Sequence, residues 1–150
     1  PAFSCDIATG TTVIPRRFYL AQGGSVAGGV ISVLVTWDDK STGRYSSAGT
    51  ALTTKSLRRD APNTSTVTWY YGATLGAVNS HNLIWAGILN NDVITSPTDP
   101  GKFVDLMDHT EVFPVLVGPA QIVIYTFAAG TQPSWFFKFV WAEYSTSAVV

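Results

Sequence analysis

The amino-acid sequence predicts an all-β fold: a single antiparallel β-sandwich or jelly-roll-like domain of about eight strands. Three observations predict it. Apolar residues recur at every second position in several segments, as expected of strands with one face in a core. β-Branched and aromatic residues, which pack well on a pleated sheet, are abundant. Clusters of Gly, Pro, Asn and Asp separate the periodic segments at short intervals and indicate turns.

The alternation is clearest in segments 29–37, 66–71 and 135–142, and each of these predicts a strand with one face in the core. In the last segment, four aromatic residues share one face: Trp135, Phe137, Phe139 and Trp141. Because much of the opposite face is also apolar, we predict that this strand is central in its sheet or covered on both sides.

Shorter patterns predict further strands at 17–21, 83–89, 111–117 and 121–128. Residues 102–109 (KFVDLMDH) fit either one helical turn or a short strand, and helical signals are weak elsewhere. The sequence contains no internal repeat, low-complexity tract or linker. One β domain spanning residues 1–150 is therefore the simplest organisation.

The composition argues against several classes of function. Charged residues make up 13% of the chain, and the formal net charge is −1. Nucleic-acid binding requires a basic face, which nine scattered Lys and Arg do not form, so we expect no nucleic-acid partner. No apolar run is long enough for a membrane span and no signal peptide is present, so we expect no membrane insertion. Because the sequence starts at Pro1 rather than Met, we expect it to be excised from a longer chain.

The sequence carries no recognisable catalytic motif, and we predict neither an enzyme nor a cofactor. Ser25 follows two glycines, but Ala27 stands where a nucleophile elbow has its second Gly, and no helix is expected after it. Asp38 and Asp39 are adjacent, so on a strand they point to opposite faces and do not flank a substrate. These two residues are better explained as the opening of a turn.

Metal and thiol chemistry have equally weak signals. Cys5 is the only cysteine and excludes an intrachain disulfide, and His81 and His109 lack the ligand spacing of a zinc site. We therefore predict no metal site. One acidic group leaves an alternative open: its residues either lie in a solvated turn or bind a calcium ion together with other loops. The group consists of Asp99, Asp105, Asp108 and Glu111. Asn63 opens an N-glycosylation sequon, which matters only in a secretory pathway.

Aromatic residues beside predicted turns are the main signal for binding. Most of the five Trp are expected in the core, but aromatic side chains near loops can stack on sugar rings or anchor a protein contact. Loops on a rigid β scaffold are where binding residues usually lie. We predict a binding surface at loop tips formed by these residues: Asp38, Asp39, Lys40, Arg44, Tyr45, Tyr70, Tyr71 and Trp85.

Two stretches resemble the protruding surface domains of small icosahedral RNA-virus capsid proteins of the noda-, tombus- and tetravirus-like kind. They are residues 66–71 (TVTWYY) and the closing run 131–144 (TQPSWFFKFVWAEY), which ends close to the chain terminus as the last strand of such a domain does. The resemblance spans the chain as a general pattern of short strands. Lectins and carbohydrate-binding modules share this pattern.

The resemblance implies a non-enzymatic domain on the virion surface that self-associates as a dimer or trimer and contacts a host receptor or glycan. The absence of an Arg-rich arm agrees with it, since in these families that arm belongs to the shell portion of the chain. The alternative is a lectin or carbohydrate-binding module of a secreted protein. A hydrolase on a β-sandwich would need a carboxylate pair or triad that the sequence does not show.

Overall fold

The computed structural model describes residues 3–22, 30–39, 45–47, 49–57, 60, 65–75, 82–90, 103–105, 114–128 and 134–148. Within these ranges the regular structure is almost entirely β. The elements are β1 (Phe3–Ile7), β2 (Thr11–Gln22), β3 (Val30–Asp39), β4 (Tyr45–Ser47), β5 (Thr50–Leu52), β6 (Thr68–Tyr71), β7 (Thr74–Leu75), β8 (Asn82–Asn90), β9 (Phe103–Asp105), β10 (Leu116–Val117), β11 (Ala120–Ala128), β12 (Trp135–Ser145) and a 3₁₀ turn at Thr146–Ala148.

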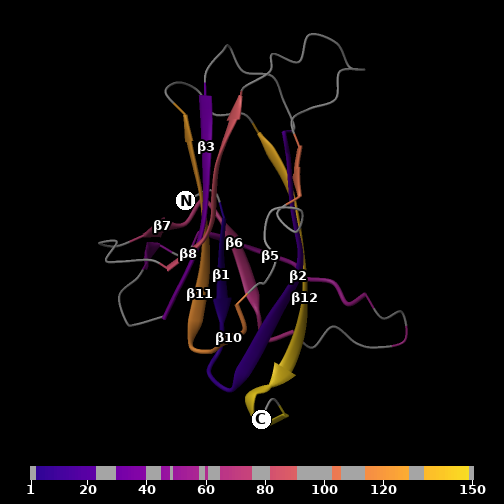
Figure 1. The fold of residues 1–150 in the computed structure, drawn as a ribbon. Coiled ribbons are helices and arrows are strands. Elements are labelled where there is room, and N and C mark those ends of the chain that lie inside the picture. The colour runs from indigo at the N-terminus through magenta and orange to yellow at the C-terminus, as the bar shows by residue number, and fades with distance from the viewer. Residues whose placement is uncertain are drawn as a thin grey trace.

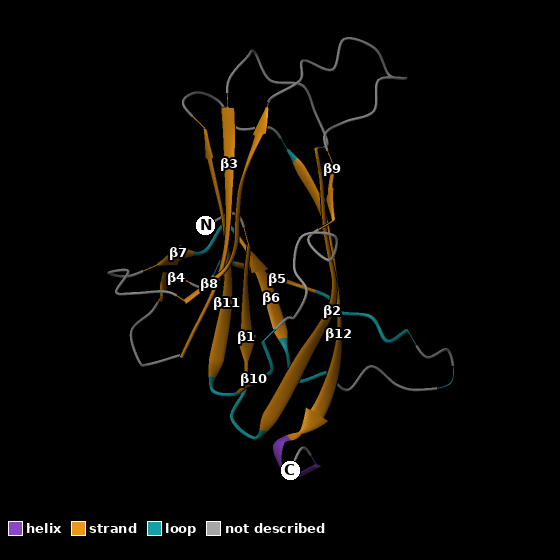
Figure 2. Ribbon diagram, viewed as in Figure 1, coloured by secondary structure: helices purple, strands orange, loops and turns teal. Residues whose placement is uncertain are grey.

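The strands form two facing antiparallel sheets, as Figures 1 and 2 show. Sheet A has six strands in the order β5-β6-β1-β11-β3-β8. Sheet B has the order β10-β2-β12, and β9 also pairs with β2. β4 pairs with β7 in a separate two-stranded ribbon, drawn in Figure 2 on the side of sheet A that faces away from sheet B. The predicted all-β sandwich is confirmed.

The core lies between the sheets and is built by the alternation along each strand. Fully buried apolar side chains come from the central strands of both sheets, including Ile7, Phe18, Leu20, Ile122 and Ile124. Burial of such a side chain contributes about 1.5–3 kcal/mol to stability, so these alternating residues hold the two layers together.

Several predicted strands correspond to strands of the structure. Segments 29–37, 66–71, 83–89 and 121–128 correspond to β3, β6, β8 and β11, while segment 17–21 is the second half of the longer β2. Residues 103–105 form a strand rather than a helical turn, and β10 occupies the end of segment 111–117, whose first residues lie outside the described ranges. β1 was not predicted, although Phe3, Cys5 and Ile7 alternate with polar residues there, because a segment of five residues is too short for the alternation to stand out.

The position of β12 differs from the prediction. In the described part of the chain β12 pairs with β2 alone, so it lies at the edge of sheet B. Phe136 on its outer face is 70% exposed, and the aromatic residues on its inner face are only partly buried. The expectation of a central or doubly covered strand is therefore wrong, because apolar residues on both faces do not report whether a neighbouring strand is present.

Candidate functional site

The sandwich is open on the side where β12 faces β5 and β6. A groove of about 1260 Å³ lies there between the edges of the two sheets. Its walls are β12, the segment 52–57 that follows β5, and residues 65–66 before β6. No hydrogen bond between main-chain atoms joins segment 52–57 to β12 within the described residues. We call this space the open-side groove.

Aromatic rings from three strands form the floor of the open-side groove. The ring centroid of Trp69 lies 5.0 Å from that of Phe137 and 4.8 Å from that of Phe139, and both pairs are tilted. Phe3 lies 4.2 Å from Phe137, and Phe139 stacks on Trp141 at 5.5 Å. These distances are typical of attractive aromatic pairs, so the floor is a continuous and well-packed aromatic surface.

The local sequence of β12 explains this surface. The period of two along the strand directs Phe137, Phe139, Trp141 and Glu143 to the inner face, opposite Trp69. Because β12 ends its sheet, these side chains stay partly exposed, whereas Trp69 on β6 is 2% exposed. The groove therefore presents partly accessible aromatic faces on a rigid scaffold, a property of binding sites.

Glu143 closes one end of the groove through a hydrogen-bond network. Its carboxylate accepts hydrogen bonds from the Ser65 hydroxyl at 2.8 Å and from both the amide and the hydroxyl of Thr66 at 2.8 Å. The Trp141 indole donates a weaker bond at 3.4 Å. Burial raises the pKa of the Glu143 carboxyl, but these hydrogen bonds to the ionised form outweigh burial and hold the pKa below its usual value. The network fixes residues 65–66 to β12.

Because its pKa is lowered on folding, Glu143 should stabilise the protein above its ordinary pKa of about 4.5, and this contribution should disappear as the pH falls through the lower folded value. Glu143→Gln is expected to reduce the free energy of unfolding near neutral pH by about 1 kcal/mol. At a pH below the lowered pKa of Glu143, where the carboxyl is protonated, the two proteins should converge. Urea unfolding of both proteins across this pH range measures the effect, and parallel pH profiles would contradict it.

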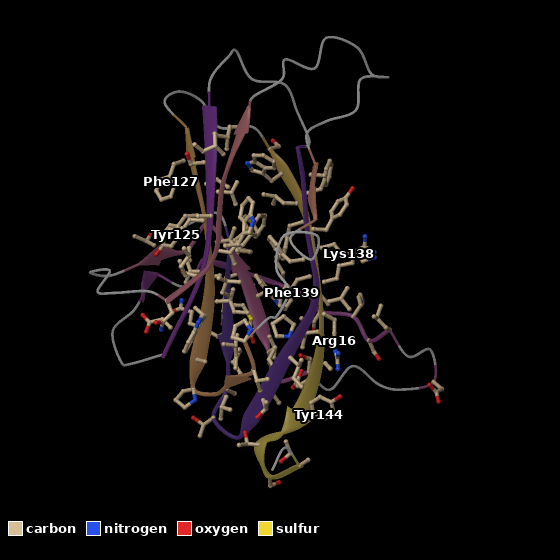
Figure 3. All side chains as sticks on the ribbon, viewed as in Figure 1. Arg16, Tyr125, Phe127, Lys138, Phe139 and Tyr144 are labelled. Carbon is tan, nitrogen blue, oxygen red and sulfur yellow. The ribbon has the colours of Figure 1, made fainter. Side chains whose placement is uncertain are left out.

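A second surface lies on the outer face of sheet A. Tyr125 and Phe127 project from β11 with their rings stacked at 5.7 Å, and Figure 3 shows both on the side away from sheet B. Phe127 is 52% exposed and Ile88 on β8 is 70% exposed. Through the strand register, Phe127 and Ile88 lie on either side of Ser32, while Tyr125 and Ala86 lie on either side of Leu34. We call this surface the apolar face of sheet A.

The predicted loop-tip residues are distributed over different parts of the fold. Asp38 is 6% exposed in β3 and Trp85 packs partly buried against the core, so neither is at an exposed loop tip. Tyr70 and Tyr71 end β6, and Tyr71 is 48% exposed. Asp39 ends β3 and Tyr45 begins β4. Their role in binding stays a prediction.

Other predicted positions lie outside the described residues. They are Ser25, Lys40, Arg44, Asn63, His81, Asp99, Asp108, His109 and Glu111. Asp105 lies in β9. In the ranges that the structure describes, no three His, Cys, Asp or Glu side chains come together to hold a metal ion.

Cys5 is a free thiol that is completely buried in the core. Burial, together with the negative charges of Asp6 and Glu143, raises the pKa of the Cys5 thiol well above its usual value. The thiolate is the nucleophilic form of cysteine, so Cys5 in this position serves as a small apolar core residue.

Comparisons with protein-family models, with curated proteins and with solved structures found no match. Among the described residues, no helix has the length and hydropathy that crossing a bilayer requires. Function is therefore inferred from the open-side groove and the apolar face of sheet A.

Proposed function

We propose that this chain is a non-enzymatic assembly and attachment domain, of the kind that small icosahedral RNA viruses carry on their capsid surface. In this proposal, copies of the chain associate through the apolar face of sheet A, and the open-side groove contacts the host. The apolar face of sheet A is the observation that carries the proposal.

An outward sheet face in contact with water usually carries polar residues that alternate with the buried ones. On β11, β3 and β8 the outward positions instead include Tyr125, Phe127, Leu34 and Ile88, which surround Ser32, so all three strands contribute apolar side chains to this face. Contiguous exposed apolar surface of this kind marks interaction sites. An apolar sheet face can pack on a second copy of itself across a two-fold axis, which is the commonest symmetry of oligomers.

The test is the oligomeric state in solution, measured by sedimentation equilibrium. We expect the unaltered chain to form a dimer or trimer, and the double variant Ile88→Ser with Phe127→Ser to be a monomer with an unchanged circular dichroism spectrum. Phe136→Ser is the matched control, because Phe136 is 70% exposed like Ile88 but lies on sheet B. It should leave the oligomer intact. An unaltered chain that sediments as a monomer at every concentration would overturn the proposal.

A monomeric carbohydrate-binding module is the second candidate function, and the open-side groove favours it. Partly exposed aromatic faces, such as those of Trp141 and Phe139, are suited to stacking on sugar rings. The sedimentation experiment separates the two candidates, because only the assembly domain requires association of the chain with itself.

A further inference from the structure

We propose that the open-side groove binds an extended peptide of a partner protein, which pairs as an additional strand with the free edge of β12 and carries an acidic side chain opposite Lys138. The inference deepens the attachment role proposed above and rests on it, because it states which chemistry the groove recognises. It does not depend on self-association through the apolar face of sheet A.

β12 has one main-chain edge that is open to pairing. In the described part of the chain its eleven residues pair with β2, and no hydrogen bond between main-chain atoms joins the other edge to a further strand. Proteins usually protect such edges with proline or with a bulge. β12 contains no proline, and the register shift between Val140 and Trp141 places the extra residue, Arg16, in β2. The edge is therefore available to an extended chain.

The groove follows this edge. Every residue from Trp135 to Trp141 lines it, so the groove meets both faces of β12 and the main chain between them. The facing wall is equally continuous and runs from Leu52 to Leu57. An extended peptide matches this shape, because its N–H and C=O groups can pair along the edge while its side chains contact the walls.

At the open side, sheet B ends one strand before sheet A. β12 lies over β6 and β1, since the ring of Phe137 contacts those of Trp69 and Phe3. Sheet A continues past β6 with β5, whereas β12 is the last described strand of sheet B on this side. A strand added beside β12 would face β5 and cover the aromatic floor. Because segment 52–57 bounds the groove, the space suits a single strand better than the edge of a second sandwich.

The two faces of β12 specify the side chains of the added strand. Its inward positions would contact the aromatic floor, so apolar residues are expected at every second position. Its outward positions would lie beside Phe136, Lys138 and Val140 on the outer face of β12. Lys138 is exposed, and Figure 3 shows it on the side of sheet B away from sheet A. An acidic residue directly opposite Lys138 would therefore form a favourable cross-strand pair.

A peptide fits the groove better than a saccharide. A saccharide can stack on Phe139 and Trp141, but it would leave the row of main-chain N–H and C=O groups beside it unpaired. An extended peptide satisfies these groups and covers the same aromatic faces.

The test uses a synthetic heptapeptide with Val, Ile and Val at its second, fourth and sixth positions, Asp at its third, and Thr elsewhere. Isothermal titration measures its binding to the unaltered chain, and NMR measures amide hydrogen exchange. In the free chain, alternate amides of β12 should exchange quickly because they point to the open edge. The peptide should slow these amides at least about tenfold. Unchanged exchange in β12, or tighter binding of a chitin tetrasaccharide than of the peptide, would overturn the proposal.

Two N-methylated versions of the peptide test whether its main chain is recognised. One carries methyl groups on the amides of the even positions, and the other on those of the odd positions. Successive N–H groups of an extended strand point to opposite edges, so in only one version do the methyl groups face β12. We expect that version to bind at least about tenfold more weakly than the other. Equal affinities would show that the main chain does not pair and would contradict the proposal.

Lys138→Glu tests the acidic position. It should weaken binding of the peptide about fivefold and strengthen binding of a version with Lys in place of Asp by a similar factor. Arg16→Glu is the matched control, because Arg16 is an exposed cation on the same side of sheet B but outside the groove lining. It should change both affinities by less than about twofold. Equal effects of the two substitutions would indicate diffuse attraction and overturn the proposal.

The double variant Ile88→Ser with Phe127→Ser separates this proposal from self-association. It should bind the peptide with unchanged affinity, because both residues lie on the outer face of sheet A. A monomeric chain that still binds the peptide would support the groove proposal alone. If the double variant instead associates with itself through β12 and excludes the peptide, a second copy occupies the groove and the proposal is wrong.

Discussion

Replacement of Trp69 by alanine is expected to lower the free energy of unfolding by about 3–5 kcal/mol, a loss at the upper end of what single core substitutions cause. Trp69 is 2% exposed on β6 and its ring contacts Phe137 and Phe139 of the opposite sheet. The change therefore removes a contact between the two layers at the open side and leaves a cavity beneath β12. Because domains are stable by only about 5–15 kcal/mol, a large part of the stability would be lost.

Trp69→Phe is the matched control for this prediction. The indole nitrogen of Trp69 is buried and has no hydrogen-bond partner in the part of the chain that the structure describes, so the change to Phe removes an unsatisfied donor while it keeps an aromatic ring. We expect it to cost about 1 kcal/mol, well below the loss in Trp69→Ala. Chemical unfolding monitored by circular dichroism gives both values. A small loss in Trp69→Ala would show that β6 and β12 are not coupled through this ring.

The fold class could be predicted from the sequence because the period of two is a local property. Ile31, Val33 and Val35 of β3, and Ile122 and Ile124 of β11, alternate with residues of the outer face, and all five are buried. The pairing of these strands is not local. β1 lies between β6 and β11, and no pattern in residues 3–7 indicates partners so distant in sequence.

The candidate site could not be predicted because distant segments meet in it. The groove combines Phe3, segment 52–57, residues 65–66, Trp69 and β12, which approach one another only after the sheets pack. The loop-tip prediction assumed that aromatic residues near turns are exposed, but Trp85 packs against the core. Whether a side chain near a turn is exposed depends on which sheet face it occupies.

One signal for the site was present in the sequence. Glu143 continues the inner-face alternation of Phe137, Phe139 and Trp141, so a charge follows three aromatic residues on a face that should be apolar. A carboxylate at such a position needs hydrogen-bond donors from another segment. Its partners, Ser65 and Thr66, are more than 70 residues away, and only the structure identifies them.

Gln121→Met is expected to raise the free energy of unfolding by about 2 kcal/mol. Gln121 is completely buried on the outer face of β11, and among the described residues neither its amide nitrogen nor its amide oxygen has a hydrogen-bond partner. An unsatisfied buried polar group loses its hydration without compensation. Methionine has a similar length and no such group, and no described side chain loses a hydrogen bond when the amide is removed.

Two variants in adjacent positions test this explanation. Ser4 lies opposite Val123 on the same face, and its buried hydroxyl also has no partner within the described ranges, so Ser4→Ala should be neutral or stabilising. The Thr36 hydroxyl in β3 instead donates to the Val123 carbonyl at 3.2 Å, so Thr36→Val should lose about 1 kcal/mol. Thermal and urea unfolding give the three values. If Gln121→Met destabilises the protein, the explanation from an unsatisfied buried amide is wrong.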